Sequence, residues 1–219
     1  ICPPLQERTM TAQKSLVTTR NPQQLRSKTR MNEILNATKS IMAISGSIDL
    51  KMKDIAKAAN VTVSSIYQYF PNKDAIVKVL AQSYLNQWSE QVATQVKQVS
   101  SAKEIQGLVI SLIKDFYQRY KCDSVLQDIW GSKSSDKIYQ NIDMEHHLVI
   151  QGIIYNDLKF LFDQTSWPKL ETTILLSLHQ GSAAIRLALT LSENEAEKIM
   201  AIYTQQTLNA INELLPTQH

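Results

Sequence analysis

Apolar residues recur at intervals of three and four from about residue 27 to residue 215, which is the spacing of amphipathic α-helices. No run of alternating β-branched and polar residues indicates a sheet, and only 5 glycines and 6 prolines interrupt the chain. The pattern therefore predicts an all-α fold. The expected helices span about 27–45, 51–58, 62–69, 73–98, 102–120, 124–131, 136–164, 168–190 and 193–215.

The stretch from Lys53 to Asp74 has the pattern of two short helices joined by a tight turn. Asn60 lies at the turn, and Asn is among the few non-glycine residues that tolerate a left-handed backbone. Thr62 follows where the second helix needs an N-cap, and Ile66 and Phe70, four positions apart, form its buried side. This is the pattern of a helix-turn-helix. Its outward face holds Val63, Ser64, Tyr67 and Gln68.

Further helix ends carry local signals. Gly46 is expected to end the first helix, and Asn72, after Pro71, to cap the fourth. Ser192 and Glu195 have the spacing of a capping box for the last helix. The second helix begins without Ser or Thr, so Asp49 is the candidate cap there.

The charge of the chain is unevenly distributed. The net charge is +3, but up to residue 78 twelve basic side chains face five acidic ones, which leaves +7 there and −4 in the remainder. A basic first part and an acidic remainder are typical of a DNA-binding domain attached to a second module. With 219 residues, 43% of them hydrophobic, the chain is long enough for one or two domains with buried cores.

Other classes of protein find little support. No apolar run approaches the roughly 18 residues of a membrane span, and residues 1–25 lack the apolar core of a signal peptide. Cys2 and Cys122 lie far apart, so a disulfide framework is not expected and a reducing cytoplasm fits better. The chain opens on Ile1, and Met10 is a candidate initiator.

Candidates for catalysis are few. His146 and His147 are adjacent, so on a helix they point about 100° apart and do not form the i, i+4 pair of a metal site. Cys122 has Lys121 beside it, but a solitary cysteine is more often structural. Glycine-rich phosphate loops, nucleophile elbows and zinc-ligand spacings are not found. We expect no enzyme activity, no catalytic residue, no metal and no cofactor.

Two specific stretches carry a resemblance to a known family. Residues 54–62 read Asp-Ile-Ala-Lys-Ala-Ala-Asn-Val-Thr, and residues 66–76 read Ile-Tyr-Gln-Tyr-Phe-Pro-Asn-Lys-Asp-Ala-Ile. Together they closely resemble the DNA-binding domain of the TetR family of transcriptional regulators, and residues 34–46 resemble the family's first helix. The resemblance is specific over about residues 27–80 and only architectural beyond. It implies a flexible basic arm at 1–26, a helix-turn-helix domain at 27–78 with its recognition helix at about 62–69, and a helical ligand-sensing and dimerisation domain at 79–219.

The resemblance also assigns roles in binding double-stranded operator DNA. Val63, Ser64 and Tyr67 align with positions that reach base edges, and Gln68 with either role. Many members of the family have Gly where Asn60 and Ser64 stand here, so Ser64 narrows the clearance to DNA. The positions expected to contact phosphates are Lys51, Lys53, Thr62, Ser65, Tyr69 and Lys73.

In the same family the last two helices form a dimer interface. A ligand that binds the helical domain, here residues 79–219, shifts the fourth helix, here about residues 73–98. Small and apolar residues in the last two helices fit this role, with Ile174, Leu178, Gly181, Ile185, Met200, Tyr203, Leu208 and Ile211 as the expected interface. The expected residues around an unidentified small-molecule effector are Phe116, Tyr120, Trp130, His147, Tyr155 and His179. A dimeric repressor released by its ligand is the function implied. An activator of the same fold and a helical protein-interaction module without DNA binding stay open as alternatives.

Overall fold

A computed structural model describes residues 22–132 and 137–216, and within these ranges the chain is helical without a strand. The all-α prediction is confirmed. The α-helices are α1 (Pro22–Ser45), α2 (Met52–Ala58), α3 (Val63–Tyr67), α4 (Lys73–Val96), α5 (Ala102–Cys122), α6 (Ser124–Ser132), α7 (Lys137–Leu158), α8 (Trp167–Ala188) and α9 (Glu193–Asn212). Two short 3₁₀ turns, η1 (Lys159–Leu161) and η2 (Gln164–Ser166), connect α7 to α8.

Most of the expected helix ends agree with the structure. Gly46 has φ +72° after α1, and the Asn72 side chain accepts a hydrogen bond from the Ala75 N–H at the start of α4. Ser192 and Glu195 form the predicted capping box. The cap expected from Asp49 is wrong, because the N-cap of α2 is Lys51 and no side chain caps it.

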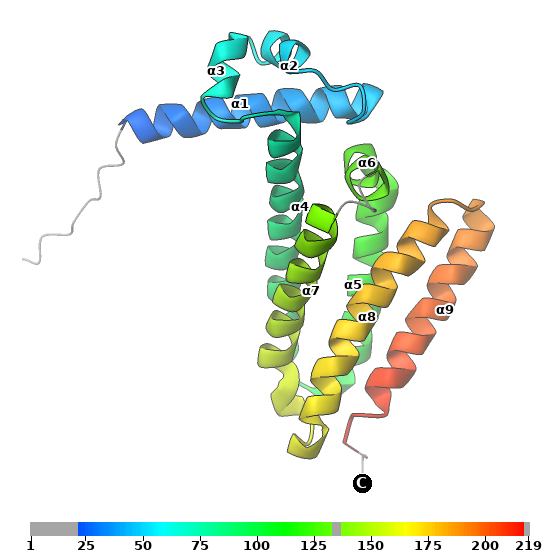
Figure 1. Cartoon of the computed structure of the whole chain (residues 1–219). Helices are drawn as coiled ribbons and strands as arrows, with labels where there is room; N and C mark the ends of the chain where they lie inside the picture. The colour runs from blue at the N-terminus through cyan, green and yellow to red at the C-terminus, as the bar shows by residue number, and fades with distance from the viewer. Residues whose placement is uncertain (1–21, 133–136, 217–219) are drawn as a thin grey trace, which may run out of the picture.

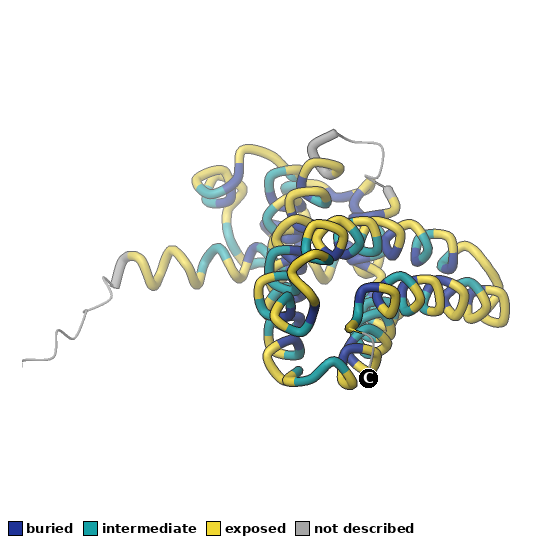
Figure 2. The backbone as a smooth tube through the Cα atoms, turned by 90° about the horizontal axis from the view of Figure 1, so that it is seen from below, coloured by how far each residue is buried: buried dark blue, intermediate teal, exposed yellow. Residues whose placement is uncertain are grey.

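Two expected boundaries are corrected. Helix α7 ends at Leu158 rather than near residue 164, because the chain then folds around Trp167, whose Nε1 donates to the carbonyl oxygens of Lys159 and Phe162. At the other end, residues 1–21 of the expected arm lie outside the described residues, and residues 22–26 belong to α1. Figure 2 shows α1 projecting from the rest of the molecule, and residues 24–29 of this projecting part are all exposed.

The first three helices form one unit at the end of α4. Helix α1 lies across that end, and α2 and α3 lie against its other side (Figure 1). Their facing apolar side chains, among them Ile34, Ile55, Ile66 and Phe70, are fully or almost fully buried. Burying such side chains stabilises the fold by roughly 1.5–3 kcal/mol each. Since α3 itself has only five residues, this shared core must hold it in place.

The remaining helices form an elongated bundle. Helix α4 runs beside α7, α7 beside α8 and α8 beside α9, and α5 lies against α9 (Figure 1). Apolar side chains at helical spacing along α4, including Ile76, Leu80, Tyr84 and Trp88, are buried as expected. Helix α4 is therefore shared by both units, with its first turn under α1 and its last turns in the bundle.

A second connection joins the two units through α6. The Ser47 N–H, directly after the left-handed Gly46, donates to Asp128 Oδ2 at 2.8 Å. Nearby, Asp123 accepts a hydrogen bond from the Tyr84 hydroxyl at 2.8 Å and lies 3.5 Å from Lys39 of α1. Burial alone would raise the pKa of Asp123, but the Tyr84 hydrogen bond, backbone N–H groups and Lys39 hold it below its usual value. Two carboxylates thus bind the end of α1 to the bundle.

Candidate DNA-binding surface and internal cavity

The turn between α2 and α3 is built as the sequence predicts. Asn60 has φ +51°, and among the described residues it is the only one other than glycine with a positive φ. The Thr62 hydroxyl then accepts a hydrogen bond from the Ser65 N–H at 3.2 Å, which is the expected N-cap. Such a cap stabilises a helix by about 1 kcal/mol. The turn and the cap together fix the direction in which α3 leaves.

Helix α3 buries one side and exposes the other. Ile66 is buried against α1 and α2, whereas Tyr67 is 54% exposed and Val63 38% exposed. Ser64 is also exposed, and its hydroxyl lies 3.0 Å from that of Thr62. This outer face holds an apolar group, hydroxyls and an aromatic phenol, which are groups able to contact base edges in a DNA major groove.

The expected phosphate-contacting residues fall into two groups. Lys51, Lys53 and Thr62 are exposed, as is Gln68, whereas Ser65 and Tyr69 are half-buried at the junction with α1. All of them lie in or next to α2 and α3. Hydroxyls and ammonium groups in this arrangement can donate to anionic oxygens.

Lys73 has a structural role that the sequence did not indicate. Its Nζ donates to the carbonyl oxygens of Ile48 at 3.0 Å and Ser47 at 3.5 Å. It thereby satisfies backbone acceptors in the turn after α1. An ammonium group has three protons to donate, so one remains available to a phosphate.

The structure adds basic residues that sequence reasoning missed. Arg30 of α1 borders a surface hollow between α1, α2 and α3 that also includes Lys57, Asn60 and Thr62. Arg26 lies one turn earlier, on the projecting part of α1. Arg30 is paired with Glu33 at 2.9 Å. Only the packing of α1 across α3 places these residues at the same surface, so no local sequence signal identifies them.

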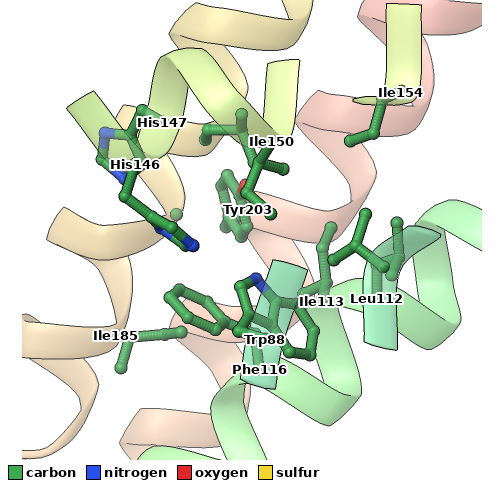
Figure 3. Close-up of a pocket in the computed structure, with 13 residues that line it drawn as sticks. Trp88, Leu112, Ile113, Phe116, His146, His147, Ile150, Ile154, Ile185 and Tyr203 are labelled. Carbon is green, nitrogen blue, oxygen red and sulfur yellow. The ribbon is translucent and has the colours of Figure 1, made fainter. Parts of the chain in front are cut away.

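The bundle contains two adjoining cavities, each partly open to the surface. The first, here the histidine lobe, has a volume of about 60 Å³ and is bordered by Trp88, Phe116, His146, His147 and Ile185, among others. The second, here the distal lobe, has a volume of about 100 Å³ and is bordered by aliphatic side chains and Phe162. Both lobes share the following residues: Leu112, Ile113, Ile154, Leu178 and Tyr203. In Figure 3 the histidines lie toward one end, Ile154 and Leu112 toward the other, and Tyr203 lies between.

The two histidines differ in their hydrogen bonds. His146 Nε2 lies 3.1 Å from the Ser89 hydroxyl and 3.0 Å from the Leu85 carbonyl oxygen. His147 Nε2 lies 3.1 Å from the Ser182 hydroxyl. Burial lowers the pKa of His146 to about 4 and also lowers the pKa of His147. Both imidazoles are therefore neutral at pH 7.

Of the six residues expected around an effector, two border a cavity and four do not. Phe116 and His147 border the cavity. Tyr120 and Trp130 are buried elsewhere, in edge-to-face contact with each other. Tyr155 lies under Lys159, and His179 is exposed outside His147, 5.7 Å from its ring. These four residues do not border either lobe. Aliphatic wall residues were missed because their spacing does not differ from that of any helix core.

The expected dimer residues lie mostly inside the chain. Six of them are buried in its own core and do not reach a surface open to a second chain: Ile174, Gly181, Ile185, Met200, Tyr203 and Ile211. Leu178 and Leu208 are half-buried. The exposed apolar residues of the same two helices are Leu176, Ala183 and Leu187 of α8 and Ala201 and Ile202 of α9. The composition of the two helices indicated a second apolar face, but not which residues form it.

Among the described residues, no three His, Cys, Asp or Glu side chains lie close enough together to hold a metal ion. None of the helices in the described ranges is long and apolar enough to cross a membrane.

Comparison with known families gives two matches. Residues 34–80 match the model of bacterial regulatory proteins of the tetR family. Residues 103–206 match the model of the tetracyclin repressor-like C-terminal domain. The two matches cover the helix-turn-helix and most of the bundle.

A curated relative and several solved structures are also similar. The fatty acid metabolism regulator protein of Bacillus subtilis is 34% identical over 79 residues, which is 36% of this chain and 41% of that protein. The chain thus aligns with less than half the length of this relative. A TetR-family regulator from Pectobacterium atrosepticum has a TM-score of 0.64 at 15% identity, covering 91% of this chain and 100% of that one.

Two other similar structures belong to proteins with a named function or a bound ligand. The fatty acid degradation regulator FadR from Bacillus halodurans has a TM-score of 0.59 at 15% identity, over 84% of this chain and 98% of that one. RolR in complex with its ligand resorcinol has a TM-score of 0.57 at 13% identity, over 88% and 98%. At these identities the structures show a shared fold.

Proposed function

Because the chain belongs to the TetR family of bacterial regulatory proteins, whose members are DNA-binding transcription regulators and not enzymes, we propose that it is a dimeric repressor released from its operator by a small molecule. A cytoplasmic location goes with this proposal. The observation that carries it is the exposed face of α3, which displays Val63, Ser64 and Tyr67 above a fully buried Ile66.

Base recognition belongs to that face. The Val63 methyl groups suit a thymine methyl, and the Ser64 and Tyr67 hydroxyls can bond to base edges. Phosphate contacts belong to the surrounding polar residues, which orient α3 in the groove without reading sequence. We assign this role to Lys51, Lys53, Thr62, Ser65, Tyr69 and Lys73, with Arg26 and Arg30 of α1 added from the structure.

Dimerisation is assigned to the outer faces of α8 and α9. Leu176, Ala183 and Leu187 are separated by seven and four positions and so share one face of α8. Helix α9 runs alongside and exposes Ala201 and Ile202 (Figure 1). A symmetric pair would present two α3 helices to successive major grooves, about 34–36 Å apart, and would require a pseudopalindromic operator.

Release is assigned to the internal cavity. Its walls come from helices α4, α5, α7, α8 and α9, so an occupant that separates them moves α4, whose first turn lies under α1. An effector acts by binding the non-DNA-fitting state more tightly. The names of the Bacillus subtilis relative and of FadR favour genes of fatty acid metabolism as the targets.

Two alternatives are distinguished by experiment. An activator of the same fold would bind the same kind of operator but raise transcription. A helical interaction module would not bind DNA, and the exposed lysines around α2 and the hydroxyl-rich face of α3 count against it.

The test is selection of bound DNA from a random duplex pool, with Tyr67→Ala as the matched variant. We expect enrichment of an inverted repeat with half-site centres one helical turn apart. A reporter downstream of that repeat then separates repression from activation. Failure to enrich any inverted repeat at low salt would remove operator binding from the proposal.

A further inference from the structure

The first turns of α1 form a basic surface outside the core of the helix-turn-helix. Residues 24–29 are all exposed, so they bury nothing against α2 or α3. They include Arg26 and Lys28, and the first turn of α1 carries no acidic residue. These turns therefore add positive charge to the surface without adding to the buried core.

A surface hollow, here the α1 trough, lies between these turns and the end of α3. It is bordered by Leu25, Arg26, Ser27, Thr29, Arg30 and Glu33 of α1 and by Tyr69, two residues after α3. Arg30 also borders the neighbouring hollow beside Thr62, the N-cap of α3. The trough thus adjoins the helix to which we assign base recognition.

The groups along the trough suit an extended anion. Arg26 and Arg30 are four residues apart, so they share one face of α1 with their Cβ atoms about 5–6 Å apart. Each guanidinium presents a planar fork of N–H donors that matches phosphate oxygens. On the other side the Tyr69 hydroxyl can donate to the same kind of acceptor. Two cationic groups in a row and a phenol opposite them can hold a sugar–phosphate strand.

Glu33 is the group at the trough that opposes an anion. Its carboxylate lies 2.9 Å from Arg30, and the two side chains are 46% and 42% exposed. An exposed ion pair of this kind is weak, so a phosphate can compete for Arg30. A guanidinium also has enough N–H donors to bind a carboxylate and a phosphate together.

The direction of α1 decides which part of the DNA reaches the trough. The first turns of α1 project on the side of the molecule opposite to α8 and α9 (Figures 1 and 2). In a dimer formed through α8 and α9, the two troughs therefore lie at the outer ends, beyond the two α3 helices. Residues 24–29 span about 9 Å, which is the length of roughly three base pairs.

We propose that the DNA strand flanking each half-site lies in the α1 trough, with Arg26 and Arg30 bound to neighbouring phosphates. The bound operator is then longer than the inverted repeat by about three to four base pairs at each end. Because phosphates carry no sequence information, any sequence serves in these flanks. The inference rests on the proposed function and adds to it the extent of the operator.

The test measures the affinity of the full chain for duplexes that carry the selected inverted repeat with flanks of increasing length. We expect affinity to rise until each flank reaches about four base pairs and then to stay level, whatever the flank sequence. Arg26→Ala should remove about tenfold of this rise for each half-site, the worth of one hydrogen bond to a charged group. It should leave the affinity for the duplex without flanks unchanged. A wild-type affinity independent of the flanks, or an equal rise in Arg26→Ala, overturns the inference.

Lys28→Ala is the matched control. Lys28 is exposed in the same turns, but it lies two residues from Arg26, on another side of the helix, and does not border the trough. Its removal should change the rise by less than about twofold, because an exposed charge without a specific contact contributes little. Equal losses in Lys28→Ala and Arg26→Ala would mean general attraction to basic charge and would overturn the trough.

Glu33→Gln should act in the opposite direction. It removes a carboxylate beside the bound phosphates and frees Arg30 from its ion pair, so affinity for the flanked duplex should increase. Uncharged methylphosphonate linkages in the flanks should weaken binding of the wild type but weaken Arg26→Ala no further. A lower affinity of Glu33→Gln, or additive effects of Arg26→Ala and the uncharged linkages, contradicts the assignment.

The experiment separates two kinds of failure. If an inverted repeat is enriched but its flanks have no effect, the trough assignment is wrong and operator binding stands. If no inverted repeat is enriched, the proposed function is wrong, and binding of a long random duplex at low salt tests the trough alone. There a greater loss in Arg26→Ala than in Lys28→Ala supports the trough, and equal affinities overturn it.

Discussion

Tyr67 and Lys73 lie on the same proposed DNA-binding surface, but their side chains are held in different ways. The Tyr67 side chain is exposed on the outer face of α3, whereas the Lys73 ammonium is held by two backbone carbonyl groups at the start of α4. A group aimed at bases affects specificity, and a group aimed at phosphates affects affinity for every sequence. We expect Tyr67→Ala to lower operator affinity by about 1–3 kcal/mol and to relax the sequence preference at one position.

Lys73→Ala should lower affinity for all sequences to a similar extent without changing the preference. It should also lower the melting temperature, because the Ile48 carbonyl loses its donor. Binding curves on the selected operator and on single-base variants of it distinguish the two effects. Unchanged affinity in both variants would place the DNA-binding surface elsewhere.

Gly181 is required by a neighbouring side chain rather than by its backbone. A Cβ at this position would lie 2.6 Å from the Tyr203 hydroxyl oxygen and 3.1 Å from Cζ of the same ring. That hydroxyl donates to the Ser177 carbonyl oxygen at 2.7 Å. Gly181→Ala should therefore displace Tyr203 from its place between the two lobes and lower the free energy of unfolding by about 1–3 kcal/mol.

The matched control is Gly107→Ala in α5, where a Cβ meets nothing within 4 Å. An exposed helical glycine changed to alanine should stabilise the protein by up to about 1 kcal/mol. Urea denaturation of both variants checks the pair, and a stabilising Gly181→Ala would show that Tyr203 adapts without cost.

At the scale of elements, the sequence predicted where helices begin and end better than which face each one buries. Asn60, Thr62, Asn72 and Ser192 act through neighbours at most four residues away, so their roles can be read locally. The inner and outer faces of α8 and α9 are both apolar, and only the position of α5 and α7 decides which one is covered. For this reason Ile185 was expected at an interface and lies in the core.

The effector residues show the same limit. Aromatic residues were expected around a ligand, but Tyr120 and Trp130 complete a chain of ring contacts with Phe116 inside the core. Whether an aromatic side chain borders a cavity depends on the shape left by several helices together. His147 was expected near the effector because of its residue type alone. Its contact with Ser182 through Nε2, which leaves Nδ1 without a hydrogen-bond partner, depends on how α7 packs against α8.

The contact between α6 and the end of α1 is the element-scale feature most open to experiment. Asp128 of α6 accepts the Ser47 N–H at 2.8 Å, and two residues later Trp130 Nε1 donates to Asp143 of α7 at 3.2 Å. A hydrogen bond to a charged group contributes about 1.5–3 kcal/mol. We expect Asp128→Ala to loosen α1–α3 from the bundle, seen as faster hydrogen exchange in α1–α3 with α8 and α9 unchanged.

Asp115→Ala provides the comparison. Asp115 accepts hydrogen bonds from Gln91 and Gln95 within the bundle, at 3.2 and 2.7 Å, so its loss should accelerate exchange in α4 and α5 instead. If both variants gave the same exchange pattern, the Asp128 contact would have no specific role in joining the two units.

For the whole molecule, the distribution of charge predicts how DNA binding responds to salt. The first 78 residues carry +7 and the remainder −4, so attraction to phosphates is concentrated at one end. With three lysines, Arg26 and Arg30 in each half-site, a dimer would neutralise about ten phosphates and lose roughly 10⁵-fold in affinity between 50 and 200 mM salt. Lys73→Ala should reduce the slope of log K against log[salt] by about two per dimer, whereas Tyr67→Ala should leave it unchanged.

The last prediction concerns the symmetric assembly on which operator spacing depends. Leu187 of α8 is 49% exposed and Ile202 of α9 is 57% exposed, and a second copy of the chain would bury both. A carboxylate at the centre of such an interface would face its symmetry mate without a counter-charge, which is strongly unfavourable. Leu187→Glu should therefore convert the protein from about twice 24.8 kDa to 24.8 kDa in sedimentation experiments.

The same variant should bind the inverted repeat no better than a single half-site, because each half-site would be occupied independently. Phe160→Glu is the control, since Phe160 is also apolar and exposed, at 63%, but lies in η1, next to the first turn of α8 and at the opposite end of that helix from Leu187. It should leave both mass and operator affinity unchanged. A dimeric Leu187→Glu protein, or a monomeric Phe160→Glu protein, would move the interface from the outer face of α8 and α9 to another part of the surface.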